Sequence, residues 1–257
     1  MLKLDRTYLN LILVVSALTA LYLLSQNWKN QLVVEKVKVY DTHILTDNEV
    51  RDLADIPTGS PLYKLSLLGI ARRVERNPFV DRAVVVRALP YDVAITVREH
   101  DPIALVATPS SMFSIDRGGI VLPLAMKRKN NMPVITNVRE QLQVGDTAKG
   151  TLMQAVKFID DAQRFGPSLS ANIAEVRIDG GDLIAYTTVS SLEIIIGRND
   201  FNRKLLYLRK FLNDIADSGG QNYKYVDLRF NGQIVVGTGS SSLNNQIAMM
   251  RTAGKGN

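Results

Sequence analysis

Few residues in this chain are of types that could carry out chemistry. His43 and His100 are the only imidazoles, they lie far apart in the sequence, and no acidic cluster with metal-ligand spacing accompanies either. The chain has no cysteine, which excludes thiolate nucleophiles, disulfides and Cys-ligated metals. No HExxH, GxSxG, GxGxxG or Walker pattern is present. We therefore expect surface or turn roles for both histidines, and no metal or cofactor.

The sharpest enzymatic alternative is a membrane-anchored hydrolase with a Ser/Lys dyad. Ser111 would be the nucleophile and Lys127 the base, which must be neutral to accept a proton. Lys127 begins the polar run KRKNN, which predicts a solvated and charged side chain. The sequence therefore favours an ordinary serine at the start of a strand.

Two pairs of carboxylates, Asp116 with Asp146 and Asp179 with Asp182, also lie beside glycines. Aspartate next to glycine is typical of turns, where the carboxylate supports the backbone. Charge gives no other lead, because the net charge of +6 is a mild excess and basic and acidic residues are interspersed. We expect no nucleic-acid-binding surface.

An uncharged stretch near the N-terminus, residues 7–28 (TYLNLILVVSALTALYLLSQNW), is the strongest pattern in the chain. As a helix it would extend about 33 Å, enough to cross a hydrocarbon core of about 30 Å. Tyr8 and Trp28 lie at its ends, where amphipathic rings favour the membrane interface. Lys3 and Arg6 precede it, which favours a cytoplasmic N-terminus. The stretch predicts a transmembrane helix.

Two other interpretations of this stretch are less favoured. A cleaved signal peptide needs small residues at two positions before the cut, and with Ala20 as the last of them the other position holds Leu18. A buried core helix is disfavoured by the length and uniform apolarity of the run. We therefore expect a short cytoplasmic tail over residues 1–6, one anchor, and an extracytoplasmic remainder.

Residues 33–100 predict the order strand, helix, helix, strand, strand. Lysines alternate with Val37 and Val39 in the first strand. Thr46 and Glu49 form a capping box that opens the first helix. An apolar stripe over residues 67–74 predicts the second helix, and two alternating strands follow, joined by a turn at residues 89–92 (LPYD).

This first module resembles the POTRA domain of the bacterial cell-division family FtsQ/DivIB. The segments that carry the resemblance are residues 59–63 (GSPLY), 78–80 (PFV), 87–90 (RALP) and 97–104 (VREHDPIA). The last departs slightly from the family pattern, which commonly has a basic residue after the glutamate where this chain has His100. The resemblance implies that the module is a recognition domain, with residues 70–78 and the 87–90 hairpin as weak candidates for recruitment.

Residues 101–236 predict a mixed, β-rich second module. It opens with a hairpin around residues 116–119 (DRGG), and helical stripes run over residues 152–162 and 201–215. The final strand spans residues 225–236 and contains an Asn-Gly break. Residues 237–257 are rich in Gly, Ser, Asn and Thr and predict a disordered tail.

The final strand also resembles FtsQ/DivIB, through residues 225–230 (YVDLRF) and Gly232. The last strand of an open sheet has unpaired N–H and C=O groups along one edge, which accept a strand from another chain unless they are blocked. In the family, the small bitopic division proteins FtsB and FtsL dock there. The resemblance therefore implies a partner site whose contact positions are Arg229, Phe230, Gly232, Ile234 and Val235.

The sequence thus predicts an α+β protein with an N-terminal transmembrane helix, a βααββ POTRA domain and a β-rich domain with two helices and an open-edged sheet. The predicted function is a non-enzymatic scaffold of the division septum in the cytoplasmic (inner) membrane, which recruits FtsB- and FtsL-like proteins and other division proteins. A POTRA protein of secretion or outer-membrane assembly is the second alternative. Such proteins usually carry several POTRA modules and a barrel.

Overall fold

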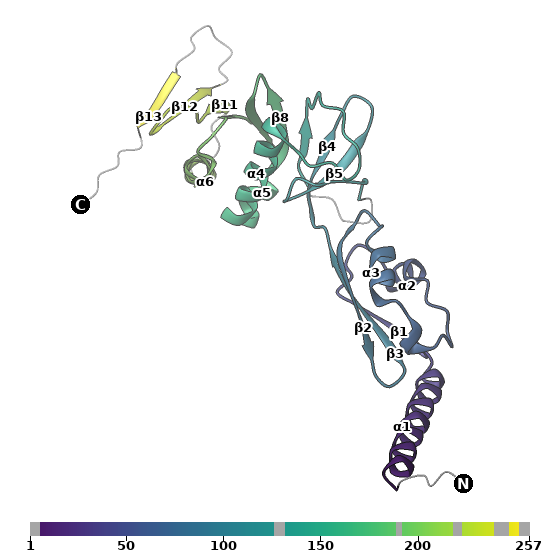
Figure 1. Ribbon diagram of the computed structural model, residues 1–257. Coiled ribbons are helices and arrows are strands. Elements are labelled where there is room, and N and C mark those ends of the chain that lie inside the picture. Colours follow the sequence, from purple (N-terminus) through teal and green to yellow (C-terminus); the bar gives the residue numbers. More distant parts are fainter. Residues whose placement is uncertain (1–5, 126–131, 189–191, 218–222, 239–246, 252–257) are drawn as a thin grey trace, which may run out of the picture. The chain divides into compact units, whose positions relative to one another are not determined.

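The computed structural model describes residues 6–125, 132–188, 192–217, 223–238 and 247–251. The chain divides into two compact units, Met1–His100 and Asp101–Asn257 (Figure 1).

The first unit begins with helix α1, Arg6–Gln31. Its large apolar side chains between Leu11 and Leu24 are exposed. Over the described residues, no helix has both the length and the apolar character that crossing a bilayer requires.

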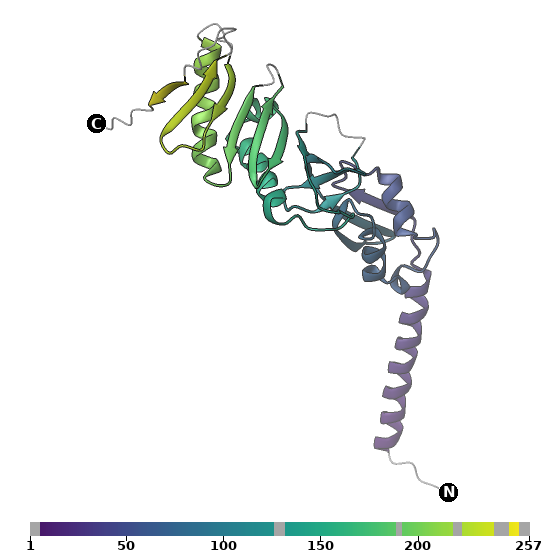
Figure 2. The ribbon, with the colours of Figure 1, turned by 90° about the horizontal axis from the view of Figure 1, so that it is seen from above.

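The rest of the first unit has the predicted order of two helices and three strands. Strands β1 (Lys36–Tyr40), β2 (Val80–Ala88) and β3 (Asp92–Glu99) form a sheet in the order β1-β3-β2, with β1 parallel and β2 antiparallel to β3. Helices α2 (Asp47–Ala54) and α3 (Leu67–Val74) cover one face of it, and the short 3-10 helix η1 (Leu62–Lys64) lies between them in sequence (Figures 1 and 2).

Local sequence signals explain where these elements begin. The Thr46 side chain accepts a hydrogen bond from the Glu49 N–H, and the Glu49 carboxylate accepts one from the Thr46 N–H at 2.7 Å. The predicted capping box is therefore confirmed. At the end of β3, the Glu99 carboxylate accepts hydrogen bonds from the backbone N–H groups of residues 43–45, at 2.7 to 3.0 Å. It thereby holds the loop that leads into α2.

The second unit contains a ten-stranded sheet in the order β13-β12-β11-β10-β9-β8-β7-β4-β5-β6. Its strands are β4 (Pro102–Ala107), β5 (Met112–Asp116), β6 (Val121–Leu122), β7 (Val134–Thr136), β8 (Ile173–Asp179), β9 (Asp182–Thr187), β10 (Glu193–Gly197), β11 (Tyr223–Asp227), β12 (Gln233–Thr238) and β13 (Ile247–Arg251). Helices α4 (Gly150–Phe165), α5 (Pro167–Ala171) and α6 (Phe201–Asp217) lie on one face of the sheet (Figures 1 and 2).

The two long helices occur where parallel strand pairs require crossovers. β7 pairs with β8 in parallel, and β10 pairs with β11 in parallel, so each connection has to pass over the sheet. Helix α4 lies in the first connection and α6 in the second, and Phe158 meets Phe201 edge to face between them. Phe201, Leu205 and Leu208 are buried, which confirms the predicted core face of α6.

The structure differs from the prediction at the C-terminal end of this sheet. Residues 225–236 do not form one strand, because the chain turns between Leu228 and Gly232 and returns as β12, antiparallel to β11. Gly232 has a φ of +70°, which glycine adopts without strain. The predicted disordered tail over residues 237–257 stays a prediction, and within it Ile247–Arg251 pair with β12 as β13. Residues 239–246 and 252–257 lie outside the described residues.

Candidate functional site

The predicted partner edge belongs to β12. One side of β12 pairs with β11, and Val226 lies opposite Val236. The other side pairs with β13, from Gln233 opposite Arg251 to Gly237 opposite Ile247. The main-chain groups on the outer side of β12 are therefore partnered by the chain's own C-terminal strand.

The five predicted contact residues lie in one hairpin but in two environments. Arg229, Phe230 and Gly232 lie in the connection between β11 and β12, whereas Ile234 and Val235 lie on β12. The Phe230 side chain is 50% exposed, so it is available to another molecule. Ile234 and Val235 are only 4% and 8% exposed. Contact with a partner at these two positions therefore depends on their backbone groups.

Arg229 already has a carboxylate partner within the chain. Its Nη2 donates to Oδ2 of Asp227 at 2.7 Å, and its Nη1 lies 3.7 Å from Asp182. The hydrogen bond to Asp227 raises the pKa of Arg229. Asp227 is itself buried, so the guanidinium neutralises a carboxylate at the end of β11. This role was missed in the sequence, although the two residues are only two positions apart.

Gly237 on β12 has a packing role that the sequence analysis also missed. A Cβ at this position would lie 2.2 Å from the Tyr225 ring on β11, so the ring lies directly against the Gly237 backbone. A glycine within an otherwise apolar strand often indicates such a close approach. The Tyr225–Gly237 contact lies on one face of the sheet and packs β12 closely against β11.

Helix α6 supports the turn of the hairpin. The Arg203 Nη2 donates to the Asn231 side-chain oxygen at 2.7 Å and is also 2.7 Å from the Asp200 carboxylate. Phe230 is therefore presented on a connection anchored at both ends, by Asp227 through Arg229 and by α6 through Asn231.

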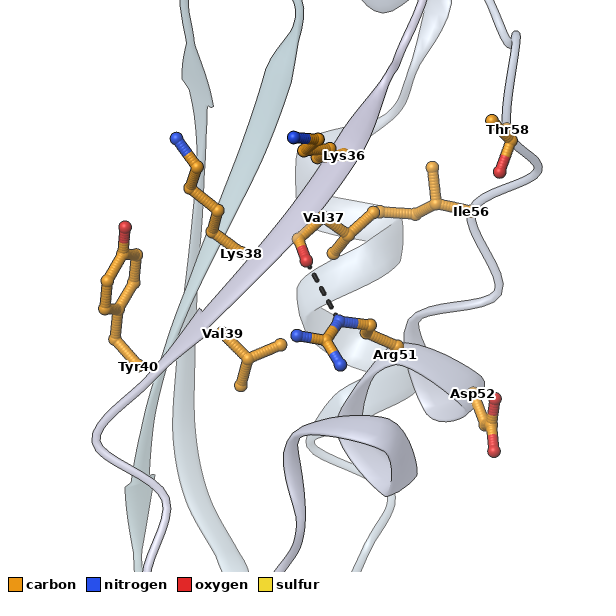
Figure 3. A pocket seen from close by; sticks show the side chains of 9 residues that line it. All are labelled: Lys36, Val37, Lys38, Val39, Tyr40, Arg51, Asp52, Ile56 and Thr58. Carbon is orange, nitrogen blue, oxygen red and sulfur yellow. Dashed lines mark hydrogen bonds between the residues drawn. The ribbon is translucent and has the colours of Figure 1, made fainter.

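A second candidate surface lies along β1 in the first unit, where a groove of about 630 Å³ runs between β1, α2 and the loop after α2 (Figure 3). β1 is also an edge strand, because among the strands that the structure describes it pairs with β3 alone. Arg51 reaches across the groove from α2, and its Nε donates to the Val37 carbonyl oxygen at 3.0 Å (Figure 3). The guanidinium also contacts Asn48 and Asp47.

The groove has mixed charge. Arg51, Lys36 and Lys38 line it together with Asp52, and Lys38 forms an ion pair with Asp92 at 2.7 Å. The hydrogen bond to Asp92 raises the pKa of Lys38, which keeps that side chain charged. This arrangement does not single out one class of ligand.

Arg87, at the start of the predicted recruitment hairpin, is occupied within the first unit. Its Nε donates to the Leu62 carbonyl oxygen at 3.0 Å, its Nη2 donates to that of Leu65 at 3.0 Å, and its guanidinium lies over the Tyr63 ring. Ile70 in the other recruitment segment is buried. Both segments contain residues that hold the domain together, and recruitment through them stays a prediction.

The residues considered for chemistry lie in ordinary structural positions. Ser111 is exposed in a turn, where its N–H donates to the Thr108 hydroxyl at 3.1 Å, and Lys127 lies outside the described residues. The carboxylate of Asp116 accepts from the Ile120 N–H and that of Asp146 from the Gln143 N–H, both at 2.8 Å. Within the described ranges, no three His, Asp or Glu side chains are grouped so that they could hold a metal ion.

Two protein families match the chain in succession. The family described as "POTRA domain, FtsQ-type" matches residues 32–100, and the family described as "FtsQ/DivIB, C-terminal related" matches residues 101–237. The second match alone spans more than half of the chain.

Individual relatives are similar over most of their length. The cell division protein FtsQ of Geotalea daltonii is 25% identical over 79% of this chain and 74% of its own. That of Salinibacter ruber is 26% identical over 88% of this chain and 90% of its own. That of Rhodothermus marinus is 27% identical over 81% of this chain and 79% of its own.

Proposed function

Because the chain belongs to the FtsQ/DivIB family of cell-division proteins, we propose that it is a non-enzymatic scaffold that recruits other membrane proteins of the division machinery. Recruitment depends on a surface that another chain can extend or cover. The edge of β12 would supply such a surface to a strand that takes the place of β13, together with the exposed Phe230 beside it.

The observation that carries this proposal is the position of β12 in the sheet. Among the described strands, only β13 lies beyond it, and β13 is a five-residue strand near the end of the chain. A partner strand that added to β12 would form the same main-chain hydrogen bonds, and Phe230 would supply a side-chain contact next to them. The Arg229 guanidinium, which is about half exposed, could form a second ion pair with an acidic partner residue while it keeps Asp227.

The partners we propose are small bitopic division proteins of the FtsB and FtsL type. Proteins of this kind carry one membrane helix and a coiled coil, so they offer short segments for strand addition rather than a large folded face. This choice rests on family membership. The β12 edge is compatible with it because strand addition needs only an extended segment.

We place the protein in the cytoplasmic membrane at the division septum, with residues 7–28 as the anchor and the two folded units outside the cytoplasm. The support is the uncharged run with Tyr8 and Trp28 at its ends. The exposed apolar side chains of α1 also need an apolar environment, since water disfavours a contiguous apolar surface of this kind.

A crosslinking pull-down from dividing cells tests this proposal. We expect small coiled-coil division proteins to be recovered with the wild-type chain and lost with the Phe230→Asp variant. Leu206→Asp is the matched control, because Leu206 is a similarly exposed apolar residue on α6. Equal recovery with all three chains would reject the β12 edge as the docking site. Recovery of secretion or outer-membrane components alone would reject the division function.

A further inference from the structure

The C-terminal strand β13 occupies the edge to which the proposed partner would bind. We infer that the segment Ile247–Arg251 is an intramolecular occupant of the β12 edge, and that a partner strand has to displace it. This inference rests on the proposed function, because it concerns the regulation of the same site.

The pairing explains why the two occupants exclude each other. β13 is antiparallel to β12 and matches it residue by residue, with Ile234 opposite Met250 and Val236 opposite Ala248. A strand edge offers one row of N–H and C=O groups, so a second strand cannot pair with β12 while β13 is in place. β13 therefore occupies the β12 edge in the way that a strand from a partner would, although it belongs to the same chain.

The structure also indicates that β13 can leave without unfolding the sheet. The core of the second unit includes Ile234 and Val236 from β12, which pack against the buried residues of neighbouring elements. β12 is therefore held by side-chain packing and by its pairing with β11 in addition to its pairing with β13, and the first two remain when β13 leaves. β13 follows the eight residues 239–246, a connection longer than the usual two to five residues of a hairpin loop.

Tethering favours occupancy in the free protein. A segment joined covalently to its binding edge has an effective concentration on the order of millimolar, so weak strand pairing still keeps the edge covered. The apparent affinity of a partner is then its affinity for an open edge multiplied by the fraction of chains whose edge is open. If β13 is docked in about nine chains of ten, the apparent affinity of a competitor falls about tenfold.

Peptide binding to the full chain in lipid nanodiscs tests this competition. The probe is a fluorescein-labelled synthetic peptide with the sequence of residues 244–254 (NNQIAMMRTAG). It is titrated into the wild-type chain, a chain that ends after Thr238, and the double variant Ala248→Pro/Met249→Pro. Neighbouring residues of a strand alternate in the direction of their N–H groups, so the two prolines remove a donor toward β12 whatever the hydrogen-bond phase.

Thr252→Pro/Ala253→Pro is the matched control, because it places the same two prolines just beyond β13. We expect the truncated and Ala248→Pro/Met249→Pro chains to bind the peptide about tenfold more tightly than the wild type and the control. Amide exchange of β12 residues Ile234–Gly237 should also accelerate in the first two chains. Affinities within twofold of one another, or no binding to the truncated chain, would overturn the inference.

The two proposals fail in different ways. Suppose that the peptide binds the truncated and Ala248→Pro/Met249→Pro chains more tightly than the wild type and the control, but Phe230→Asp leaves the pull-down unchanged. The edge is then covered by β13, and the proposed docking site is wrong. If Phe230→Asp abolishes partner recovery but the peptide affinities are equal, the docking site stands and β13 is not a competitor.

Discussion

The outer sides of β1 and β12 are covered by different means. In the first unit, the outer side of β1 has one carbonyl, that of Val37, capped by the side chain of Arg51. In the second unit, the outer side of β12 is covered by a whole strand, β13. A side-chain cap satisfies a single group and gives no template to another strand, whereas a main-chain cap can be replaced by any strand of suitable length. This difference supports our proposal that the β12 edge, rather than β1, is the recognition surface.

The largest expected effect is on stability, and it distinguishes the core strand β12 from the strand β13 that covers its edge. Val236 is 1% exposed, so Val236→Asp places an unpaired charge in the core and should lower the free energy of unfolding of the second unit by about 3–5 kcal/mol. Deletion of residues 239–257 should lower it by less than about 1 kcal/mol, because β13 lies at the sheet edge. Urea unfolding measures both values.

The matched control for this experiment is Thr238→Asp, an exposed position on the same strand, for which we expect a change within about 0.5 kcal/mol. If deletion of residues 239–257 destabilised the unit as strongly as Val236→Asp, β13 would be part of the core. The distinction between a structural strand and a replaceable cover would then be lost.

The order of elements in the first unit could be predicted because each carries a local signal. The capping box at Thr46, the alternation in β2 and β3 and the stripe in α3 are each made by residues that lie within a few positions of one another. Alternation also predicts which side of a strand is buried. Such patterns determine elements and their faces, but not the pairings between distant segments.

The features of the candidate site depend on such distant pairings. β13 is a five-residue segment whose partner is main chain, and main-chain groups are the same in every sequence. The contact of Tyr225 with Gly237 and the bond from Arg51 to Val37 join residues on different elements. The position of Arg229 and Phe230 near the last strands could be predicted from the family resemblance. The different environments of these two side chains could not be predicted from the sequence.

A smaller effect tests how closely β12 is fixed to β11. Gly237→Ala would force its Cβ into the Tyr225 ring, so we expect a loss of about 1–3 kcal/mol in the free energy of unfolding. In a Tyr225→Ala background the ring is absent, and the same change should lower stability by less than about 0.5 kcal/mol. A double-mutant cycle in urea measures the coupling. Equal losses in both backgrounds would show that the ring does not restrict position 237.

The side-chain cap on β1 should have a smaller effect still. Arg51→Met keeps the aliphatic stem but removes the donor to the Val37 carbonyl, and should destabilise the first unit by about 1 kcal/mol. Arg72→Met is the control, because Arg72 is exposed on α3. Thermal unfolding of the two variants provides the comparison. A Tm for Arg51→Met equal to that of Arg72→Met would mean that water replaces the cap without loss.

Lys204 provides a second side-chain cap, which differs from Arg51 in that it can be titrated. Its Nζ donates to the Ile196 carbonyl oxygen at 2.6 Å, at the end of β10, and the side chain is buried. Burial lowers the pKa of Lys204 from its ordinary value of 10.5, and repulsion from Arg203 lowers it further. Attraction by the carboxylates of Asp200, Asp182 and Asp227 opposes this shift but does not cancel it. A guanidinium, by contrast, stays charged across the working pH range.

The lowered pKa predicts a pH dependence of known sign. Between the folded-state pKa and 10.5, the unfolded chain binds more protons at Lys204 than the folded chain does. Stability therefore rises with pH in this interval. The free energy of unfolding of the wild type should rise relative to that of Lys204→Met as pH increases toward 10.5, whereas Lys210→Met, an exposed change on α6, should run parallel to the wild type. Urea unfolding at successive pH values measures the difference. Parallel profiles for wild type and Lys204→Met would show that the cap on Ile196 behaves like the permanently charged cap on Val37.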